Sequence, residues 1–255
     1  MKGARIWVAL VLAGAVIAAF VLRPLLPAAE RGRRLAERTG CFACHGPGGL
    51  HGASNPTRDD GTVPEFEGDV MMYAKNLDEI RQWIHDGVTA RKAKSVTWRE
   101  QRRLGVLKMP AFGRRLSDGQ ISDLVAYVAA VAGMPEPEDS LAAHGLERAG
   151  ALGCVGCHGA GGRLAGPNPG SLKGYVPSWD GADFPDLVRD RSEFDQWVEH
   201  GVARRFESNA LAKYFLRRAV LHMPAYGKRL EPGDLDALWA YVRWLRSGAV
   251  AAHGR

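Results

Sequence analysis

The chain has 255 residues, of which 46% are hydrophobic and 24% are charged. This composition is that of a folded chain with one large domain or two small ones, and it excludes an intrinsically disordered protein. Four cysteines in a chain of this length exclude a scaffold stapled by disulfides. The net charge of +6 does not by itself indicate a nucleic-acid partner, and we expect none.

The amino terminus contains an apolar run from Ile6 to Leu22 without a polar side chain. As a helix this run would be about 26 Å long, close to the ~30 Å hydrocarbon core of a bilayer. It is longer than the roughly 7–15 residues usual for the apolar region of a signal peptide, and Pro27 fits a cleavage site poorly. We therefore expect residues 1–27 to form an uncleaved single-pass anchor, with a cleaved signal as the alternative. The arginines that follow the run favour a cytoplasmic carboxyl side.

The remainder of the chain contains an internal repeat. Motifs return at an offset of 113 residues, or of 114 after a single-residue insertion between about Asp69 and Gln82. We expect one domain at residues 28–133, a linker at 134–140 that is rich in proline and acidic residues, and a second domain at 141–255. The matched segments are CFACHG with CVGCHG, Asn55–Pro56 with Asn168–Pro169, Val63–Pro64 with Val176–Pro177, Gln82–Val88 with Gln196–Val202, and Met109–Gly113 with Met223–Gly227.

Both copies show helical periodicity and no convincing strand pattern, so we expect an all-α fold. Ser117 and Gln120 form a capping box at the start of the last helix of the first copy. Gly87 and Gly201 suit the left-handed position that follows a helix. The expected helices are middle helices at about 76–86 and 192–200, further helices at 97–104 and 209–220, and last helices with buried stripes at Ile121, Leu124, Val125, Val128 and Val131 and at Leu235, Leu238 and Trp239.

The chemistry is concentrated in two C-x-x-C-H motifs, at residues 41–45 and 154–158. Two thiols at this spacing can each form a thioether to one haem vinyl group, and the histidine then lies under the iron. A redox dithiol does not need the histidine, and a zinc site would need the two pairs to converge. We therefore expect two covalently attached haem c groups. Their expected protein ligands are Cys41, Cys44, His45, Cys154, Cys157 and His158.

The second axial ligand of each iron is expected to be a methionine. Met109 and Met223 each precede a proline and occupy the same pentapeptide frame in both copies. A thioether is a soft axial ligand that raises the iron potential relative to a second histidine. The alternative is an ordinary core methionine. Met71, Met72 and Met134 have no counterpart at the repeat offset, and we expect packing or linker roles for them.

Each copy resembles a class I cytochrome c domain. The order of features is the same: a helix that leads into C-x-x-C-H, a loop rich in glycine and proline, a middle helix, a Met-Pro loop and a last helix with L-V-A-Y-V or L-W-A-Y-V. The resemblance covers about residues 28–247. In this family a proline carbonyl accepts a hydrogen bond from the axial histidine and orients the imidazole. Pro56 and Pro169 are the repeat-matched candidates, and Pro167 is nearer the family's usual position in the second copy.

Basic residues gather around both methionine loops. Val88 to Leu116 holds nine basic residues and one acidic residue, and Val202 to Leu230 holds seven and one. The resemblance implies that this side borders the haem edge, so we expect acidic partners there; an ordinary solvated helix face is the alternative. We expect surface or packing roles for His51, His85, His144, His200, His222 and His253, and core or haem-wall positions for Trp83, Trp197, Phe112 and Tyr226.

Together these features predict a membrane-anchored dihaem cytochrome c that transfers electrons in a respiratory or photosynthetic chain. Because both irons have two protein ligands, we expect outer-sphere electron transfer and no catalysis. Haem attachment to C-x-x-C-H in bacteria requires export, so we place the domains on the periplasmic side of the cytoplasmic membrane despite the arginines. The alternatives are a dihaem subunit of a larger oxidoreductase complex, a dihaem peroxidase, which would need an open iron position, and a sensor, which would need an output module.

Overall fold

The computed structural model describes residues 26–248 and shows helices joined by long loops. Within that range there is no strand, only two isolated bridges, so the all-α expectation is confirmed for these residues. The helices are α2 (Ala28–Arg38), α3 (Phe42–His45), η1 (Pro47–Gly49), α4 (Val70–Tyr73), α5 (Leu77–Asp86), α6 (Ala90–Lys94), α7 (Val96–Leu104), α8 (Asp118–Val131), α9 (Ser140–Ala151), α10 (Cys154–His158), η2 (Ala160–Gly162), α11 (Phe184–Leu187), α12 (Arg191–His200), α13 (Arg204–Glu207), α14 (Ala210–Arg218) and α15 (Asp234–Arg246).

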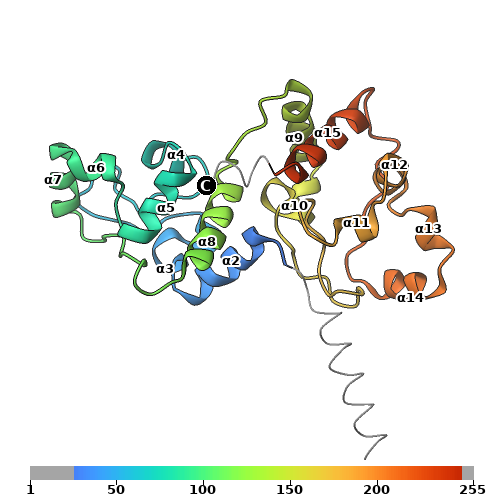
Figure 1. Cartoon of the computed structure of the whole chain (residues 1–255), viewed down its shortest axis with the longest axis horizontal. Helices are drawn as coiled ribbons and strands as arrows, with labels where there is room; N and C mark the ends of the chain where they lie inside the picture. Colours follow the sequence, from blue (N-terminus) through green and yellow to red (C-terminus); the bar gives the residue numbers. More distant parts are fainter. Residues whose placement is uncertain (1–25, 249–255) are drawn as a thin grey trace, which may run out of the picture.

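The two halves of the chain contain the same elements in the same order. The elements from α2 to α8 lie in one lobe and those from α9 to α15 in the other (Figure 1). Even the isolated bridges match, because Ser54 pairs with Thr62 and Pro167 pairs with Tyr175. The duplicated sequence therefore has a duplicated arrangement of helices and loops.

A close crossing of the first and last helices organises each lobe. α2 packs against α8, and α9 packs against α15. A glycine lies at each crossing: an added Cβ at Gly32 would lie 1.9 Å from the Asp123 carbonyl oxygen, and one at Gly145 would lie 2.0 Å from that of Ala237. Real Cβ atoms do not approach an oxygen so closely, so only glycine lets the two backbones meet.

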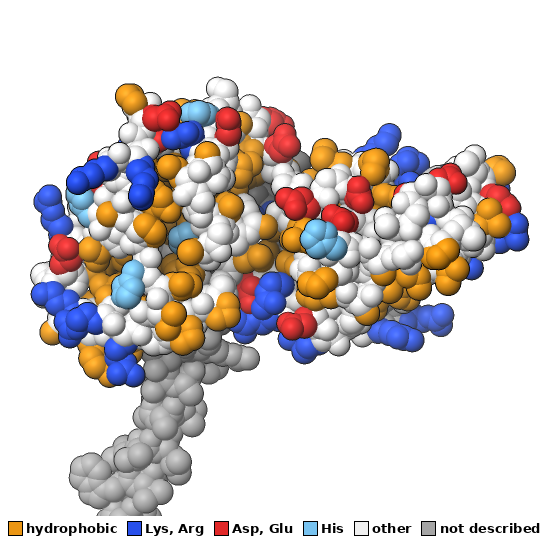
Figure 2. All heavy atoms as spheres, turned by 180° about the vertical axis from the view of Figure 1, so that it is seen from behind, with side chains coloured by type: hydrophobic (Ala, Val, Ile, Leu, Met, Phe, Trp, Pro, Cys, Tyr) orange, Lys and Arg blue, Asp and Glu red, His pale blue; other side chains and the backbone are white. Residues whose placement is uncertain are grey.

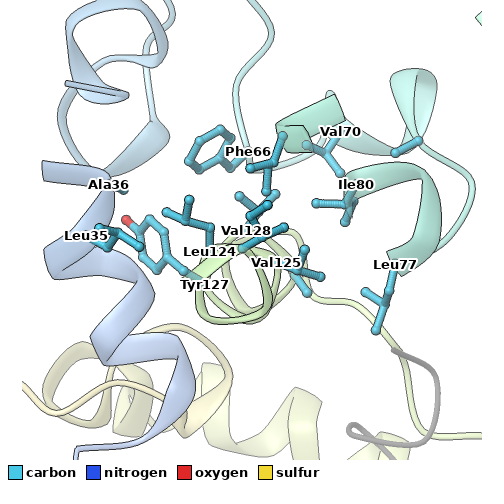
Figure 3. Packing of buried hydrophobic residues seen from close by; sticks show 14 residues of the cluster. Leu35, Ala36, Phe66, Val70, Leu77, Ile80, Leu124, Val125, Tyr127 and Val128 are labelled. Carbon is cyan, nitrogen blue, oxygen red and sulfur yellow. The ribbon is translucent and has the colours of Figure 1, made fainter. Parts of the chain in front are cut away.

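The hydrophobic core of the first lobe surrounds α8. Figure 3 shows Leu35 of α2 on one side of this helix and Ile80 of α5 on the other, with Leu124 and Val128 of α8 between them. The second lobe has a separate cluster of buried residues: Ala149, Phe184, Phe194, Val198, Leu238 and Val242. Of the two expected stripes, Val131, Leu235 and Trp239 are only half-buried, and the other members are buried.

The expected helix boundaries are found within a few residues. The side chain of Ser117 accepts from the Gln120 backbone N–H and that of Gln120 from the Ser117 N–H, which confirms the capping box. Gly87 has φ 72° and Gly201 has φ 77°, the left-handed conformation that follows α5 and α12. α9 begins at Ser140, the last residue of the expected linker, and the Asp139 side chain caps it.

Two methionines lie at the surface, and the expected membrane anchor is not among the described residues. The side chains of Met71 and Met72 are 58% and 66% exposed, so the packing role expected for them is wrong. The reason is that α4 is a single turn on which only Val70 is buried. The expected anchor at Ile6–Leu22 lies outside the described residues. Among the helices between residues 26 and 248, none is long and apolar enough to cross a bilayer.

The two lobes touch through the loop that follows the second C-x-x-C-H motif. The guanidinium of Arg163 donates to the Met134 carbonyl oxygen at 3.2 Å, and Leu164 packs against the core cluster of the first lobe. Met134 itself is half-buried on that cluster. Burial lowers the pKa of Arg163, and its side chain lies near Asp180.

The glycine crossing can be tested by a matched pair of substitutions in α9. Gly145→Ala places a Cβ against the Ala237 carbonyl oxygen, so we expect a lower melting temperature; overpacking typically costs about 1–3 kcal/mol. Gly150→Ala adds a Cβ that meets nothing within 4 Å, and we expect it to stabilise the helix by about 0.5–1 kcal/mol. Thermal unfolding followed by circular dichroism measures both. Equal melting temperatures would contradict this account of the crossing.

Candidate haem-binding sites

The cysteines of both motifs follow the first helix of their lobe. Cys41 precedes the single turn α3 and Cys44 lies in it, α10 contains Cys154 and Cys157, and both cysteines of each motif line the same cavity. All four cysteines are free thiols in the structure, so each is available for a thioether. Burial raises the pKa of the Cys41 and Cys154 thiols.

Each motif histidine is fixed by a hydrogen bond to a proline carbonyl. Nδ1 of His45 lies 2.8 Å from the Pro64 oxygen, and Nδ1 of His158 lies 2.7 Å from that of Pro177. A carbonyl oxygen can only accept, so Nδ1 carries the proton and Nε2 keeps its lone pair. Burial lowers the pKa of both histidines, which favours the neutral imidazole that a metal needs.

The prolines that accept these bonds differ from the expected ones. Pro56 and Pro169, the repeat-matched candidates, do not bind the histidines, and neither does Pro167. The loop after the motif turns back after these residues, since the Val63 N–H donates to the Ala53 oxygen and the Val176 N–H to the Gly166 oxygen. This turn places the next matched proline, Pro64 or Pro177, beside the imidazole. An aromatic ring then packs on each imidazole: Phe66 on His45 and Trp179 on His158.

The methionine loops bind to the end of the middle helices. In the first lobe the N–H groups of Phe112 and Gly113 donate to the carbonyl oxygens of Ile84 and His85, both at 3.0 Å. In the second lobe Tyr226 and Gly227 donate to Val198 and Glu199 in the same way, at 2.9 and 3.1 Å. The approach is close, since a Cβ at Gly87 would lie 2.6 Å from the Met109 oxygen. These bonds to the middle helix explain why the same pentapeptide pattern occurs in both copies.

These segments bring the predicted ligands of each copy to one cavity. Cys41, Cys44, His45 and Met109 line a cavity of about 260 Å³ in the first lobe. In the second lobe a cavity of about 960 Å³ is lined by all four matched residues, Cys154, Cys157, His158 and Met223. Most of both linings is apolar, as a large flat macrocycle requires.

The walls of the two cavities differ at several repeat-matched positions. Arg58, Trp98 and Arg102 line the first cavity, and Ser171, Ala212 and Leu216 stand at the repeat-matched positions of the second. The second cavity is also lined by Lys173, Arg205, Lys213 and Arg217, so both walls include basic side chains.

Trp98 supplies a test of whether haem fits the first cavity. Its Nε1–H is buried without a hydrogen-bond partner in the described residues, while the Arg58 guanidinium and the Lys92 ammonium lie 4.7 and 4.1 Å from the centre of its ring. A carboxylate in the cavity would satisfy this donor, whereas the Arg58 guanidinium already bonds both carboxylate oxygens of Asp60, at 3.0 and 2.9 Å. Haem carries two carboxylates on an apolar body, so the residues fit it.

An ion pair anchors the segment between the middle helix and the methionine loop. The Arg91 guanidinium bonds both carboxylate oxygens of Glu79 at 2.8 Å, and Arg205 bonds Glu193 in the same way at 2.8 and 3.0 Å. The bond from Arg91 lowers the pKa of Glu79 to about 2. These two arginines are therefore neutralised, and only part of the basic charge around the loops is free for a partner.

Other basic side chains near the methionine loops are exposed. Arg114, Arg115, Lys228 and Arg229 are exposed and form no ion pair within residues 26–248. Figure 2 shows Lys and Arg side chains along the margins of both lobes, with apolar side chains between them. Val106 and Val220, three residues before each methionine, are both 67% exposed. Each methionine loop thus combines exposed apolar and basic groups.

The remaining histidines and aromatic residues have ordinary positions. His51, His85, His144, His200 and His222 are exposed, as expected, and His253 lies outside the described residues. Nε2 of His222 lies 2.7 Å from the Leu216 oxygen, and the ring lines the second cavity. Trp83, Phe112 and Tyr226 pack on the core clusters, and the Trp197 indole donates to the Leu187 oxygen at 2.9 Å.

Two asparagines are functional candidates that the sequence did not identify. Asn55 and Asn168 are 3% and 7% exposed, and each bonds the backbone just before a methionine loop. The signal in the sequence is their exact match at the repeat offset, next to the matched prolines Pro56 and Pro169. Trp98 was also missed, and it has no counterpart in the second copy because Ala212 occupies that position.

Comparison with known proteins matches the first lobe to a protein family. The cytochrome c family model matches residues 29–132.

Two similar proteins are named cbb3-type cytochrome c oxidase subunit FixP. The one from Bradyrhizobium diazoefficiens is 27% identical over 214 residues, which covers 82% of this chain and 58% of the relative. The one from Azorhizobium caulinodans is 28% identical over 225 residues, with 88% and 62% covered. This chain therefore spans about 60% of the length of these relatives. Residues 29–132 form a cytochrome c domain.

Proposed function

We propose that this chain is a dihaem cytochrome c that transfers electrons as part of a membrane respiratory complex. The observation that carries the proposal is that a C-x-x-C-H motif and a Met-Pro methionine line one apolar cavity in each lobe. Residues 141–255 then form a second cytochrome c domain, because the elements of residues 28–133 recur there with the same hydrogen bonds to the motif histidine and the methionine loop.

Each residue of the site has a defined role in this proposal. The cysteines fix the haem covalently. His45 and His158 offer Nε2 to the iron because Nδ1 is held by a proline carbonyl. Met109 and Met223 offer a thioether on a loop fastened to the middle helix. Bound haem supplies a one-electron iron couple, while the protein excludes water and holds both ligands in place. In the first cavity the Trp98 Nε1–H would donate to a haem carboxylate.

The comparisons and the sequence together support the proposed partner and location of this chain. Both relatives are named as subunits of a cbb3-type oxidase, which supports a subunit of a larger oxidase complex over a free shuttle. We place the domains on the periplasmic side of a bacterial cytoplasmic membrane, held by a single-pass anchor at Ile6–Leu22. A dihaem peroxidase is disfavoured, because both lobes hold a methionine at the same position.

Covalent attachment predicts two haems per chain. We expect the wild type to keep both through denaturation and acid–acetone extraction. Cys154→Ser/Cys157→Ser should leave one haem, because the first motif is intact. A pyridine haemochrome assay relative to protein concentration measures the ratio. Extraction of the pigment into the organic phase would exclude covalent haem.

Axial methionine ligation predicts a near-infrared charge-transfer band in the ferric protein that accounts for both haems. Met109→His and Met223→His should each lower the midpoint potential of one haem, because imidazole stabilises ferric iron more than a thioether does. Met71→His is the control, since this side chain is 58% exposed on α4 and does not line the cavity. A redox titration measures the midpoint potentials of all three variants. Mixed high-spin and low-spin iron in the wild type would favour the peroxidase instead.

The exposed basic groups predict salt-dependent electron exchange with an acidic soluble partner. Lys228→Glu/Arg229→Glu should slow association while the haem spectra stay unchanged, because screening acts over about 10 Å at 0.1 M salt. Arg189→Glu/Arg243→Glu reverses as many charges, beside the start of α12 and near the end of α15, so its effect should be small. Stopped-flow kinetics across ionic strength measure the rates. A flat salt dependence would mean that transfer occurs within an assembled complex.

A further inference from the structure

Two buried asparagines make the same contact in both lobes. The Asn55 amide nitrogen donates to the Leu107 carbonyl oxygen at 3.1 Å, and its oxygen accepts from the Leu107 N–H at 2.9 Å. Asn168 makes the same pair of bonds to Leu221, at 3.0 and 2.9 Å. Both backbone groups of a residue two positions before each methionine are therefore satisfied by a single side chain.

The asparagines lie on the loop that also fixes the axial histidine. The Asn55 N–H donates to the Gly61 oxygen at 2.8 Å. This bond closes a turn over residues 55–61, after which the chain runs on to Pro64. The Asn168 N–H donates to the Gly174 oxygen at the same distance. One loop thus binds the histidine through a proline carbonyl and the methionine segment through an asparagine amide. The two sides of the cavity are joined by these bonds.

The methionine segments have few other anchors on their amino-terminal side. Val106 is 67% exposed and Leu107 is 36% exposed, so neither side chain holds the segment by burial. Beyond the methionine, the N–H groups of Phe112 and Gly113 fasten the loop to α5. The asparagine therefore supplies the matching attachment on the other side of Met109. In the second lobe the Val220 N–H adds one bond, to the Pro169 oxygen at 3.0 Å.

We propose that Asn55 and Asn168 are positioning residues that keep the thioethers of Met109 and Met223 on their irons. This inference rests on the proposed histidine and methionine ligation. Asparagine suits the role because its amide offers a donor and an acceptor together, the complement of one backbone N–H and C=O. A thioether stabilises ferric iron less than imidazole does, so its occupancy of the iron depends strongly on how well the segment that carries it is held.

Imidazole, which competes with methionine for ferric iron, tests the proposal on the full chain with both haems. Asn55→Leu removes both bonds at similar volume, and we expect imidazole to bind the first haem about tenfold more tightly, with a weaker near-infrared methionine band. Asn168→Leu should affect only the second haem. Asn55→Asp keeps the acceptor and loses the donor, so an intermediate effect is expected. The unaltered haem is an internal reference in each variant.

Asn76→Ala is the matched control, because Asn76 also binds a backbone N–H, that of Glu79, but as the cap of α5. We expect lower stability and an unchanged imidazole affinity. If Asn55→Leu does not mature, Asn55→Asp and Asn168→Leu decide the outcome. Unchanged imidazole affinity and an intact band in the asparagine variants would overturn the positioning role and leave the ligation standing. Absence of the band in the wild type would instead refute the ligation itself.

Discussion

The hydrogen bond from each motif histidine to a proline carbonyl is the interaction on which both cavities depend. It fixes the tautomer of His45 and His158 and leaves Nε2 free on the cavity side. The bond spans 19 residues, so the loop between must return to the motif. In each lobe a tyrosine hydroxyl of the last helix also binds the loop just after the motif. Tyr127 donates to the Gly48 oxygen at 2.8 Å, and Tyr241 donates to the Gly161 oxygen at 2.9 Å. The glycine crossings place these tyrosines, because they set the distance between the first and last helices.

Local signals in the sequence predicted local structure well. Gly87 and Gly201 end their helices as expected, and Ser117 with Gln120 caps α8, because these features depend on residues within one turn. The proline was predicted wrongly because each copy holds two repeat-matched prolines after the motif. Spacing cannot choose between them, since the choice depends on where the loop turns. The Asn55 contact spans 52 residues and leaves no periodic trace. Such long-range bonds are visible only once the loop is folded.

The two copies retain the elements around the expected axial ligands and differ in the walls of the cavities. The bonds from the histidine to proline, from the asparagine to the methionine segment and from the pentapeptide to the middle helix are the same in both lobes. Ser171, Ala212 and Leu216 stand where the first cavity has Arg58, Trp98 and Arg102, and the second cavity is lined by other cations: Lys173, Arg205, Lys213 and Arg217. Two sites with the same expected ligands therefore carry their basic side chains at different positions of the wall.

The position of the contact between the lobes separates two faces of the second lobe. The lobes touch at Arg163 and Leu164, on the loop that directly follows the second motif, so the contact lies on the histidine side of the second cavity. The exposed basic groups Lys228 and Arg229 and the apolar Val220 lie on the methionine side. In the second lobe, exchange with an outside partner and exchange with the first lobe thus have separate faces. With the proposed haem bound in the second lobe, this arrangement would let it receive electrons on one face and pass them on from the other without the partners competing for the same surface.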